Sequence, residues 1–199
     1  AVGATTAGLI AGAALLHSAG FKDSIHKERT FFGVLTVREV KAPPQRLLMH
    51  GTTLHGVQSL DERYRNAPTS YYGTRTPIGI LMRSRAKGED TRVGLVGMGI
   101  GTLAAYGRPG DLFRFYEIDP AVVRIALDPA YFDVVSHSRA KIEIVEEDGR
   151  LALESELERG DGPRFDILIL DAFNSDSVPL HLLTREALNT YRAALAPDG

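Results

Sequence analysis

The sequence contains no cysteine, and this absence excludes several kinds of site at once. Disulfides, thiolate metal centres and cysteine nucleophiles all need a thiol, so none of them belongs to these 199 residues. A strong charge of one sign is also missing, because 23 Lys and Arg residues stand against 25 Asp and Glu residues, for a net charge of -2. Domains that bind nucleic acid through bulk charge are typically basic. We therefore expect no nucleic-acid partner.

Long hydrophobic runs are scarce as well. Residues 1–19 carry no charged side chain, but Ala, Gly and Thr dominate them, which makes the run weak for a membrane-spanning helix. The basic flank and cleavage site of a signal peptide are also missing. Two interpretations stay open for residues 1–25, either a terminal segment or the end of a membrane helix before a soluble domain. Because the chain does not begin with Met, we expect it to be part of a longer one.

Residues 26–75 have the composition of a small β-rich domain. Residues 29–40 are rich in Phe, Val and Thr with partial alternation, which is typical of one strand. Two prolines then break the pattern. Residues 45–60 predict two further short strands around a turn at Gly51 or Gly56.

Residues 76–199 alternate between short apolar stretches and helical ones. This alternation predicts an α/β fold, a Rossmann-like doubly wound sheet of the S-adenosylmethionine-binding type. Ligands bind such sheets outside the carboxyl ends of the strands. Because this fold normally continues into further strands, we expect the domain to be cut at its C-terminus. The expected strands are 92–97, 112–119, 140–149 and 164–173, and the expected helices are 120–129, 150–158 and 184–197, with a short one beginning at 102.

The first expected strand runs into a glycine turn at Gly97, Gly99 and Gly101. A dinucleotide fingerprint would place its third glycine at position 102, which is Thr102. The spacing is therefore G-x-G-x-G, and nothing nearby calls for a pyrophosphate. The turn alone indicates a nucleotide without saying which.

Acidic residues end the next three strands. Glu117 closes the second strand, where its two oxygens can accept hydrogen bonds from both ribose hydroxyls. Asp148 closes the third strand, where adenine would lie. Its carboxylate could accept a hydrogen bond from the exocyclic amine of the adenine. Asp171 closes the fourth, at the reacting end of the ligand. A glycine turn, a ribose acid and an adenine acid describe an adenosine without a diphosphate, which favours an S-adenosyl-type ligand.

Several stretches resemble the spermidine synthases, which are polyamine aminopropyltransferases. The resemblance covers residues 28–199 and is closest to bacterial spermidine-synthase-like domains fused to a membrane transporter-like region. The stretches that carry it are DAFNSDSVPLHLLT (171–184), similar to the family's aspartate loop; YEIDPAVVRIA (116–126), its second-strand acid motif; VEEDGRLAL (145–153), its Asp-Gly adenine motif; LMHGTTLHGVQSLDERY (48–64), its substrate-glutamine segment; and PTSYYG (68–73), its tyrosine segment.

The resemblance implies a reaction and a set of roles. An aminopropyl group would move from decarboxylated S-adenosylmethionine, the co-substrate, to an amine, with methylthioadenosine as product and no metal. Asp171 and Tyr72 would be catalytic, Asp171 by deprotonating and orienting the amine. The implied cofactor-binding residues are Gly97, Gly99, Gly101, Glu117, Asp119, Asp148, Gly149 and Asp171, and the implied substrate-binding residues are Gln58, Tyr71, Tyr72 and Asp176.

The resemblance also implies partners and a location. The partner would be a small polyamine-type amine, the location cytoplasmic, and two further expectations are a homodimer and a membrane tether through the N-terminus. The sequence departs from the family at Ile100, where the turn usually holds Asp, and at Gly73 after the tyrosines. It also has His50 or His55 before glycine, where the family has Asp. The acceptor amine therefore stays open.

Two alternative functions remain at this point, a methyltransferase that uses S-adenosylmethionine itself and a non-catalytic nucleoside- or polyamine-binding domain. Three histidines, His50, His55 and His181, also need an interpretation. Their separations match no compact metal-ligand pattern, so we expect no metal site there. They are expected to be ordinary structural residues, with pocket lining as the alternative.

Overall fold

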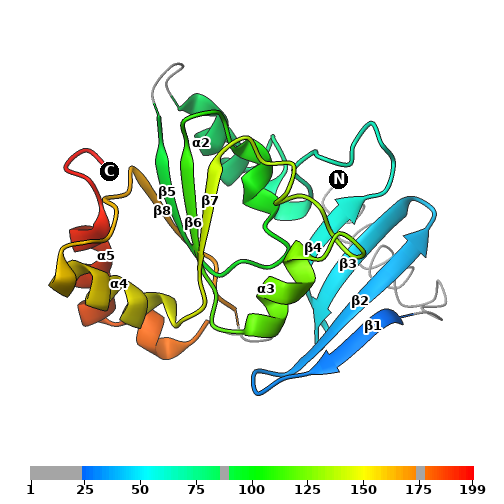
Figure 1. Cartoon of the computed structure of the whole chain (residues 1–199), viewed down its shortest axis with the longest axis horizontal. Helices are drawn as coiled ribbons and strands as arrows, with labels where there is room; N and C mark the ends of the chain where they lie inside the picture. The colour runs from blue at the N-terminus through cyan, green and yellow to red at the C-terminus, as the bar shows by residue number, and fades with distance from the viewer. Residues whose placement is uncertain (1–23, 86–89, 174–177) are drawn as a thin grey trace, which may run out of the picture.

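The computed structural model describes residues 24–85, 90–173 and 178–199, and within them the chain forms two four-stranded sheets (Figure 1). The first sheet is antiparallel and its strands pair in chain order. It consists of β1 (Ser24–Arg29), β2 (Val34–Lys41), β3 (Pro44–His50) and β4 (Thr53–Ser59). The β-rich start that the sequence predicts is therefore present.

The turns of this sheet correct one detail of the prediction. Residues 29–40 are not one strand, because Thr30 to Gly33 form a turn in which the Thr30 N–H donates to the Gly33 carbonyl at 2.8 Å. Gly33 has a φ of +147°, which glycine adopts far more readily than other residues. The β3–β4 turn lies at Gly51, with a φ of +59°, whereas Gly56 lies inside β4.

The second sheet is parallel, and its strand order is β7-β6-β5-β8. Its strands are β5 (Arg92–Val96), β6 (Leu112–Tyr116), β7 (Lys141–Val145) and β8 (Ile167–Leu170). This confirms the predicted doubly wound α/β sheet. From β5 the chain winds outward through β6 to β7 and then returns to the other side of β5 with β8. The winding direction reverses between β5 and β8, and such reversals open a crevice at the carboxyl edge.

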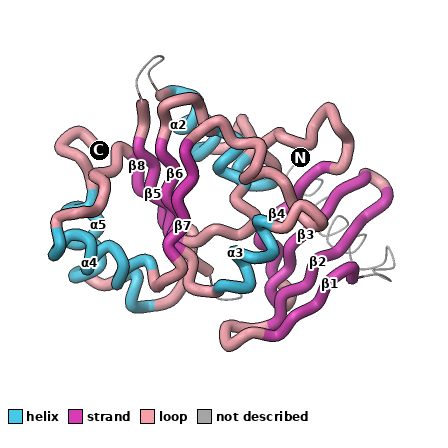
Figure 2. Tube along the Cα trace, in the orientation of Figure 1, coloured by secondary structure: helices cyan, strands magenta, loops and turns pink. Residues whose placement is uncertain are grey.

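Helices cover both faces of the parallel sheet (Figure 2). On one face lie α4 (Gly149–Arg159) and α5 (Arg185–Ala194); on the other lie α2 (Pro77–Ser84), α3 (Pro120–Leu127) and the antiparallel sheet. Strand β5 serves both cores because its side chains alternate, with Val93 and Leu95 facing one apolar cluster and Val96 facing the other. Strand β5 is thus packed on both of its faces.

The helix starts follow local sequence signals. Asp119 caps α3 by accepting a hydrogen bond from the Ala121 N–H at 2.9 Å, and Pro120 takes the first helical position as predicted. The sequence analysis missed α2, although Thr76 and Pro77 form the same kind of start. Short 3-10 helices, η1 (Ser70–Tyr72), η2 (Thr102–Tyr106) and η3 (Leu180–Leu183), complete the described elements.

A close contact joins the antiparallel sheet to the glycine turn. Ile100 has 0% exposure and packs on Gly56 of β4. A Cβ atom at Gly56 would lie 2.6 Å from Ile100 Cγ1 and 2.8 Å from Cγ2, so only glycine fits against this branched side chain. The residue that departs from the resembled family is therefore part of the core.

None of the helices in the described ranges is long and apolar enough to cross a bilayer. The interpretation of residues 1–25 as the end of a membrane helix falls almost entirely on residues 1–23, which lie outside the described part of the chain.

The contact between Gly56 and Ile100 gives a test of the fold. Gly56→Ala should lower the free energy of unfolding by about 1–3 kcal/mol through overpacking. Ile100→Ala should lower it by about 2–5 kcal/mol through the cavity that it leaves. The double variant should lose less than the sum, because the added methyl group fills part of that cavity. Urea unfolding measures all three, and additivity within about 0.5 kcal/mol would contradict the contact.

Candidate functional site

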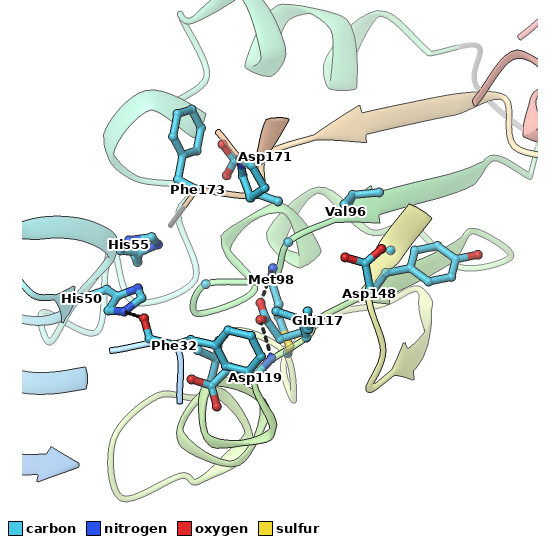
Figure 3. A pocket seen from close by; sticks show the side chains of 18 of the residues that line it. Phe32, His50, His55, Val96, Met98, Glu117, Asp119, Asp148, Asp171 and Phe173 are labelled. Carbon is cyan, nitrogen blue, oxygen red and sulfur yellow. Dashed lines mark hydrogen bonds between the residues drawn. The ribbon is translucent and has the colours of Figure 1, made fainter. Parts of the chain in front are cut away.

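A cavity of about 290 Å³ lies between the carboxyl edge of the parallel sheet and the antiparallel sheet (Figure 3). It reaches the edge between β5 and β8, where the winding direction of the sheet reverses and where this class of sheet binds its ligands. The lining residues that carry the argument below are Phe32, Leu35, Leu48, His50, His55, Gly97, Gly99, Glu117, Asp119, Asp148, Gly149, Asp171 and His181.

The glycine turn shapes the floor of this cavity. Gly97, Gly99 and Gly101 all have positive φ values, of +96°, +56° and +74°. A Cβ atom at Gly97 would lie 2.5 Å from the carbonyl oxygen of Asp171, and one at Gly99 would overlap the carbonyl oxygen of His55. Gly97 and Gly99 line the cavity, whereas Gly101 does not. The turn therefore lets three backbone segments approach one another closely.

Glu117 follows β6 and points into the cavity. Only 9% of the residue is exposed, and its two oxygens accept hydrogen bonds from the N–H groups of Met98 and Asp119, each at 3.0 Å. Burial raises the pKa of Glu117, and the backbone donors oppose this shift. Each carboxylate oxygen has a second acceptor position. Glu117 is therefore fixed and still able to bind a pair of hydroxyl groups.

Asp119 lines the same edge but both of its oxygens already have partners. One caps α3, and the other accepts a hydrogen bond from the Thr30 hydroxyl at 2.7 Å. Thr30 belongs to the turn between β1 and β2. Asp119 therefore ties the antiparallel sheet to the edge of the parallel sheet, in addition to lining the cavity.

Asp148 and Gly149 start α4 beside Val96. One oxygen of Asp148 caps the helix, and the other lies 2.8 Å from Nε2 of His181. A Cβ atom at Gly149 would lie 2.6 Å from Val96 Cγ1, so the close approach of α4 to β5 needs glycine there. The structure thus brings the predicted adenine residues to the cavity and adds His181 to them.

Asp171 follows β8 and receives two tyrosine hydroxyls. Tyr72 donates to its Oδ2, and the Tyr71 hydroxyl reaches the same oxygen at 3.5 Å. Burial raises the pKa of Asp171, and the two hydroxyl donors oppose this shift. Burial, followed by the charge of Asp171, raises the pKa of Tyr71 to about 12 and raises that of Tyr72 further, so both stay protonated. No described residue donates to Oδ1 of Asp171.

Several predicted or discussed residues do not line this cavity, namely Gln58, Tyr71, Tyr72, Ile100 and Gly101, although Tyr72 lines a small neighbouring cavity together with Asp171. Gln58 has 1% exposure, donates to the Asp133 carboxylate and the Arg65 carbonyl, and accepts from the Asp133 N–H at 3.2 Å. Its amide is therefore used within the protein rather than offered to a substrate. Ile100 faces the core, and Asp176 lies outside the described residues.

Histidines and phenylalanines that the sequence analysis did not assign to the site line it instead. His50, His55 and His181 all line the cavity, so the expectation that they are ordinary structural residues was wrong and the pocket-lining alternative holds. The described residues hold no group of three or more side chains suited to a metal ion. His50 could have been found by alternation, because it lies two residues after the buried Leu48 on β3. Phe31 is 96% exposed in the β1–β2 turn, so its inclusion in a single strand over residues 29–40 was wrong.

No protein-family model matches the chain. A curated relative, the polyamine aminopropyltransferase of Vibrio vulnificus (strain CMCP6), is 29% identical over 131 residues. That match covers 64% of this chain and 40% of the relative, so the chain spans less than half of the protein it matches.

Solved structures with the same fold include spermidine synthases. A probable spermidine synthase from Corynebacterium glutamicum has a TM-score of 0.65 at 19% identity, covering 86% of this chain and 60% of that one. The spermidine synthase from Thermotoga maritima has a TM-score of 0.54 at 16% identity, covering 86% and 53%. A third, in complex with the transition-state analogue AdoDATO, has a TM-score of 0.56 at 15% identity, covering 86% and 52%. The predicted resemblance to the spermidine synthases and the predicted fold are thereby confirmed, whereas the likeness to domains fused to a transporter-like region stays a prediction.

The Tyr72–Asp171 contact predicts a pH-dependent stability. A carboxyl group whose pKa is raised by folding contributes most at low pH, and the contribution is lost as pH rises through the folded-state pKa. Tyr72→Phe removes a donor to the carboxylate, so it should raise the pKa of Asp171 further and enlarge that loss. We expect a destabilisation of about 1.5–3 kcal/mol at neutral pH and a smaller one near pH 4.

Urea unfolding of both proteins at the two pH values measures this difference. Tyr64→Phe is the matched control, because Tyr64 is exposed and lies outside the cavity. Equal destabilisation by Tyr72→Phe at both pH values would show that the hydroxyl does not support the ionised carboxyl group.

Proposed function

We propose that this chain carries an aminopropyltransferase site, which moves an aminopropyl group from decarboxylated S-adenosylmethionine to an amine and releases methylthioadenosine. The observation that carries the proposal is the position of Asp171. It lies in the same cavity as Glu117 and Asp148 and is held by the hydroxyl of Tyr72. The similarity to a polyamine aminopropyltransferase and to spermidine synthase structures favours this reaction over methyl transfer.

The nucleoside would lie along the edge of the parallel sheet. Glu117 accepts hydrogen bonds from the ribose hydroxyls, and Asp148 with Gly149 borders the adenine. The backbone at Gly97 and Gly99 passes close to the nucleoside because these residues have no side chain. The sulfonium end then points toward Asp171, where the acceptor amine enters.

The chemistry needs a neutral amine in line with the C–S bond. The amine nitrogen attacks the aminopropyl carbon, the C–S bond breaks, and its electron pair stays on sulfur to give the neutral thioether of methylthioadenosine. Alkyl amines are protonated at neutral pH, with pKa values near that of Lys, about 10.4. Asp171 accepts the proton, and its burial makes it a better base than an exposed carboxylate. Alignment of the amine with the C–S bond within the cavity contributes the rest of the rate acceleration.

The charge of the lining favours a decarboxylated nucleoside. S-adenosylmethionine carries a carboxylate, and such a group is typically held by a cation or by several N–H donors. None of the described residues that line the cavity is Lys or Arg. A homodimer, a membrane tether through the N-terminus and a cytoplasmic location remain predictions of the resemblance.

Turnover tests the proposal directly. The protein is incubated with decarboxylated S-adenosylmethionine and a panel of amines, and mass spectrometry follows methylthioadenosine and the aminopropylated product. Asp171→Asn should lower kcat by about 10²–10⁴-fold, the contribution expected of a general base. Its affinity for methylthioadenosine, measured by calorimetry, should change little, because Glu117 and Asp148 remain.

Asp161→Asn is the matched control, since this aspartate is exposed in the loop before β8 and pairs with Arg159. Undiminished product release by Asp171→Asn would refute the assigned base. Stronger thermal stabilisation by S-adenosylmethionine than by its decarboxylated form would favour a methyltransferase. Binding without any turnover would favour a non-catalytic binding domain.

A further inference from the structure

The two walls of the cavity differ in charge. The edge of the parallel sheet contributes four carboxylates, whereas the antiparallel sheet and its β1–β2 turn contribute apolar side chains and imidazoles. Every residue from 24 to 59 is described, and none of those that line the cavity is acidic. They are Phe31, Phe32, Leu35, Leu48, His50 and His55.

His50 and His55 form a pair on this second wall, across the cavity from Asp148 in the view of Figure 3. Their ring centroids lie 5.4 Å apart. Nε2 of His50 lies 2.8 Å from the Phe32 carbonyl oxygen, which can only accept, so this nitrogen carries the hydrogen. Gly33 helps to hold the ring, because a Cβ atom there would overlap it. His50 is thus fixed in orientation.

His55 is the member of the pair with bonding capacity to spare. Its Nε2 is buried and has no hydrogen-bond partner within the described part of the chain. Burial, and then the neighbouring His50, lower the pKa of His55, so the ring is neutral at neutral pH. Buried polar atoms of native proteins generally have a partner, and a bound ligand is one explanation of an exception.

We propose that the acceptor is a primary amine with a single positive charge and an uncharged hydrogen-bonding group at its far end, received by His55 beside His50. This inference rests on the proposed function, which supplies Asp171 as the partner of the reacting nitrogen. The chemical class is an amino alcohol or an amino amide with a short methylene chain.

The argument is one of charge matching. A second ammonium group at this wall would face a neutral imidazole and apolar side chains, and a buried charge without a counter-charge is strongly disfavoured. A hydroxyl or amide group loses less hydration and can hydrogen-bond to the imidazole. Leu35 and Leu48 line the same wall and offer apolar contact to the methylene chain. A carboxylate at the far end would lack a cation.

Three acceptors of equal chain length test this inference, namely 4-aminobutan-1-ol, 1,4-diaminobutane and 4-aminobutanoate. Methylthioadenosine release gives kcat/KM for each with the wild type, His55→Asp, His55→Gln and the control His137→Gln. His137 lies outside the cavity. The wild type should prefer the amino alcohol to the diamine by at least about tenfold, because an unpaired buried charge costs more than one hydrogen bond.

The variants sharpen the result. His55→Asp supplies a counter-charge and should shift the ratio toward the diamine by at least about tenfold, whereas His55→Gln stays neutral and should keep the wild-type order. A wild-type preference for the diamine or for 4-aminobutanoate would overturn the inference. So would a ratio unchanged in a folded His55→Asp. If thermal unfolding shows that His55→Asp does not fold, the test rests on the wild type and His55→Gln. Both must then prefer the amino alcohol to the diamine in kcat/KM for the inference to stand.

A separate measurement distinguishes this inference from the proposed function. Calorimetry gives the Kd of each of the three compounds with and without methylthioadenosine. If none is turned over but the amino alcohol binds tightest, the transferase proposal fails and the recognition by His55 stands. If methylthioadenosine is released but the diamine binds tightest, the transferase proposal stands and the recognition by His55 fails.

Discussion

The backbone packing of the glycine turn is the constraint on which the rest of the structure depends. Gly97 lies against the carbonyl of Asp171, which follows β8, and Gly99 lies against the carbonyl of His55 in β4. One short turn therefore joins two neighbouring strands of the parallel sheet to the antiparallel sheet. A side chain at either glycine would force these segments apart, and the cavity between the two sheets would change shape with them.

This joint brings four acidic residues to one cavity, and none of the described residues that line it is Lys or Arg. Glu117 is supported by backbone N–H groups, and Asp171 by tyrosine hydroxyls. Such donors hold a carboxylate in place while burial keeps its affinity for protons high. That combination suits hydroxyl recognition by one acid and proton acceptance by the other. On the opposite wall, burial lowers the pKa of His55 and favours its neutral form.

Local signals predicted most of the fold, and contacts distant in sequence explain what they missed. Asp119 with Pro120 is a helix start that can be read from adjacent residues, and so are the acids that end each strand. The turn from Thr30 to Gly33 was hidden in a run of strand-forming residues. The resemblance implied that Gln58 binds substrate, and nothing in its neighbourhood reveals Asp133, 75 residues later, as the partner of its amide. Sequence patterns can place a residue at the edge of a sheet, but its hydrogen-bond partners there depend on how distant parts of the chain pack.

The two walls come from separate stretches of chain, and the bond between Thr30 and Asp119 is one of several contacts that join them. Such an arrangement separates what can vary from what cannot. The stretch from β1 to β4 can change its cavity-facing side chains, and with them the shape and charge of that wall, while the acidic edge of the parallel sheet stays as it is. The exchange is limited by the joints, since a transplanted sheet must still offer a hydroxyl to Asp119 and a glycine to Ile100. It must also keep the carbonyl of His55 beneath Gly99 and the amide of Gln58 against Asp133, so an exchange of this sheet, natural or designed, is confined to the side chains that face the cavity.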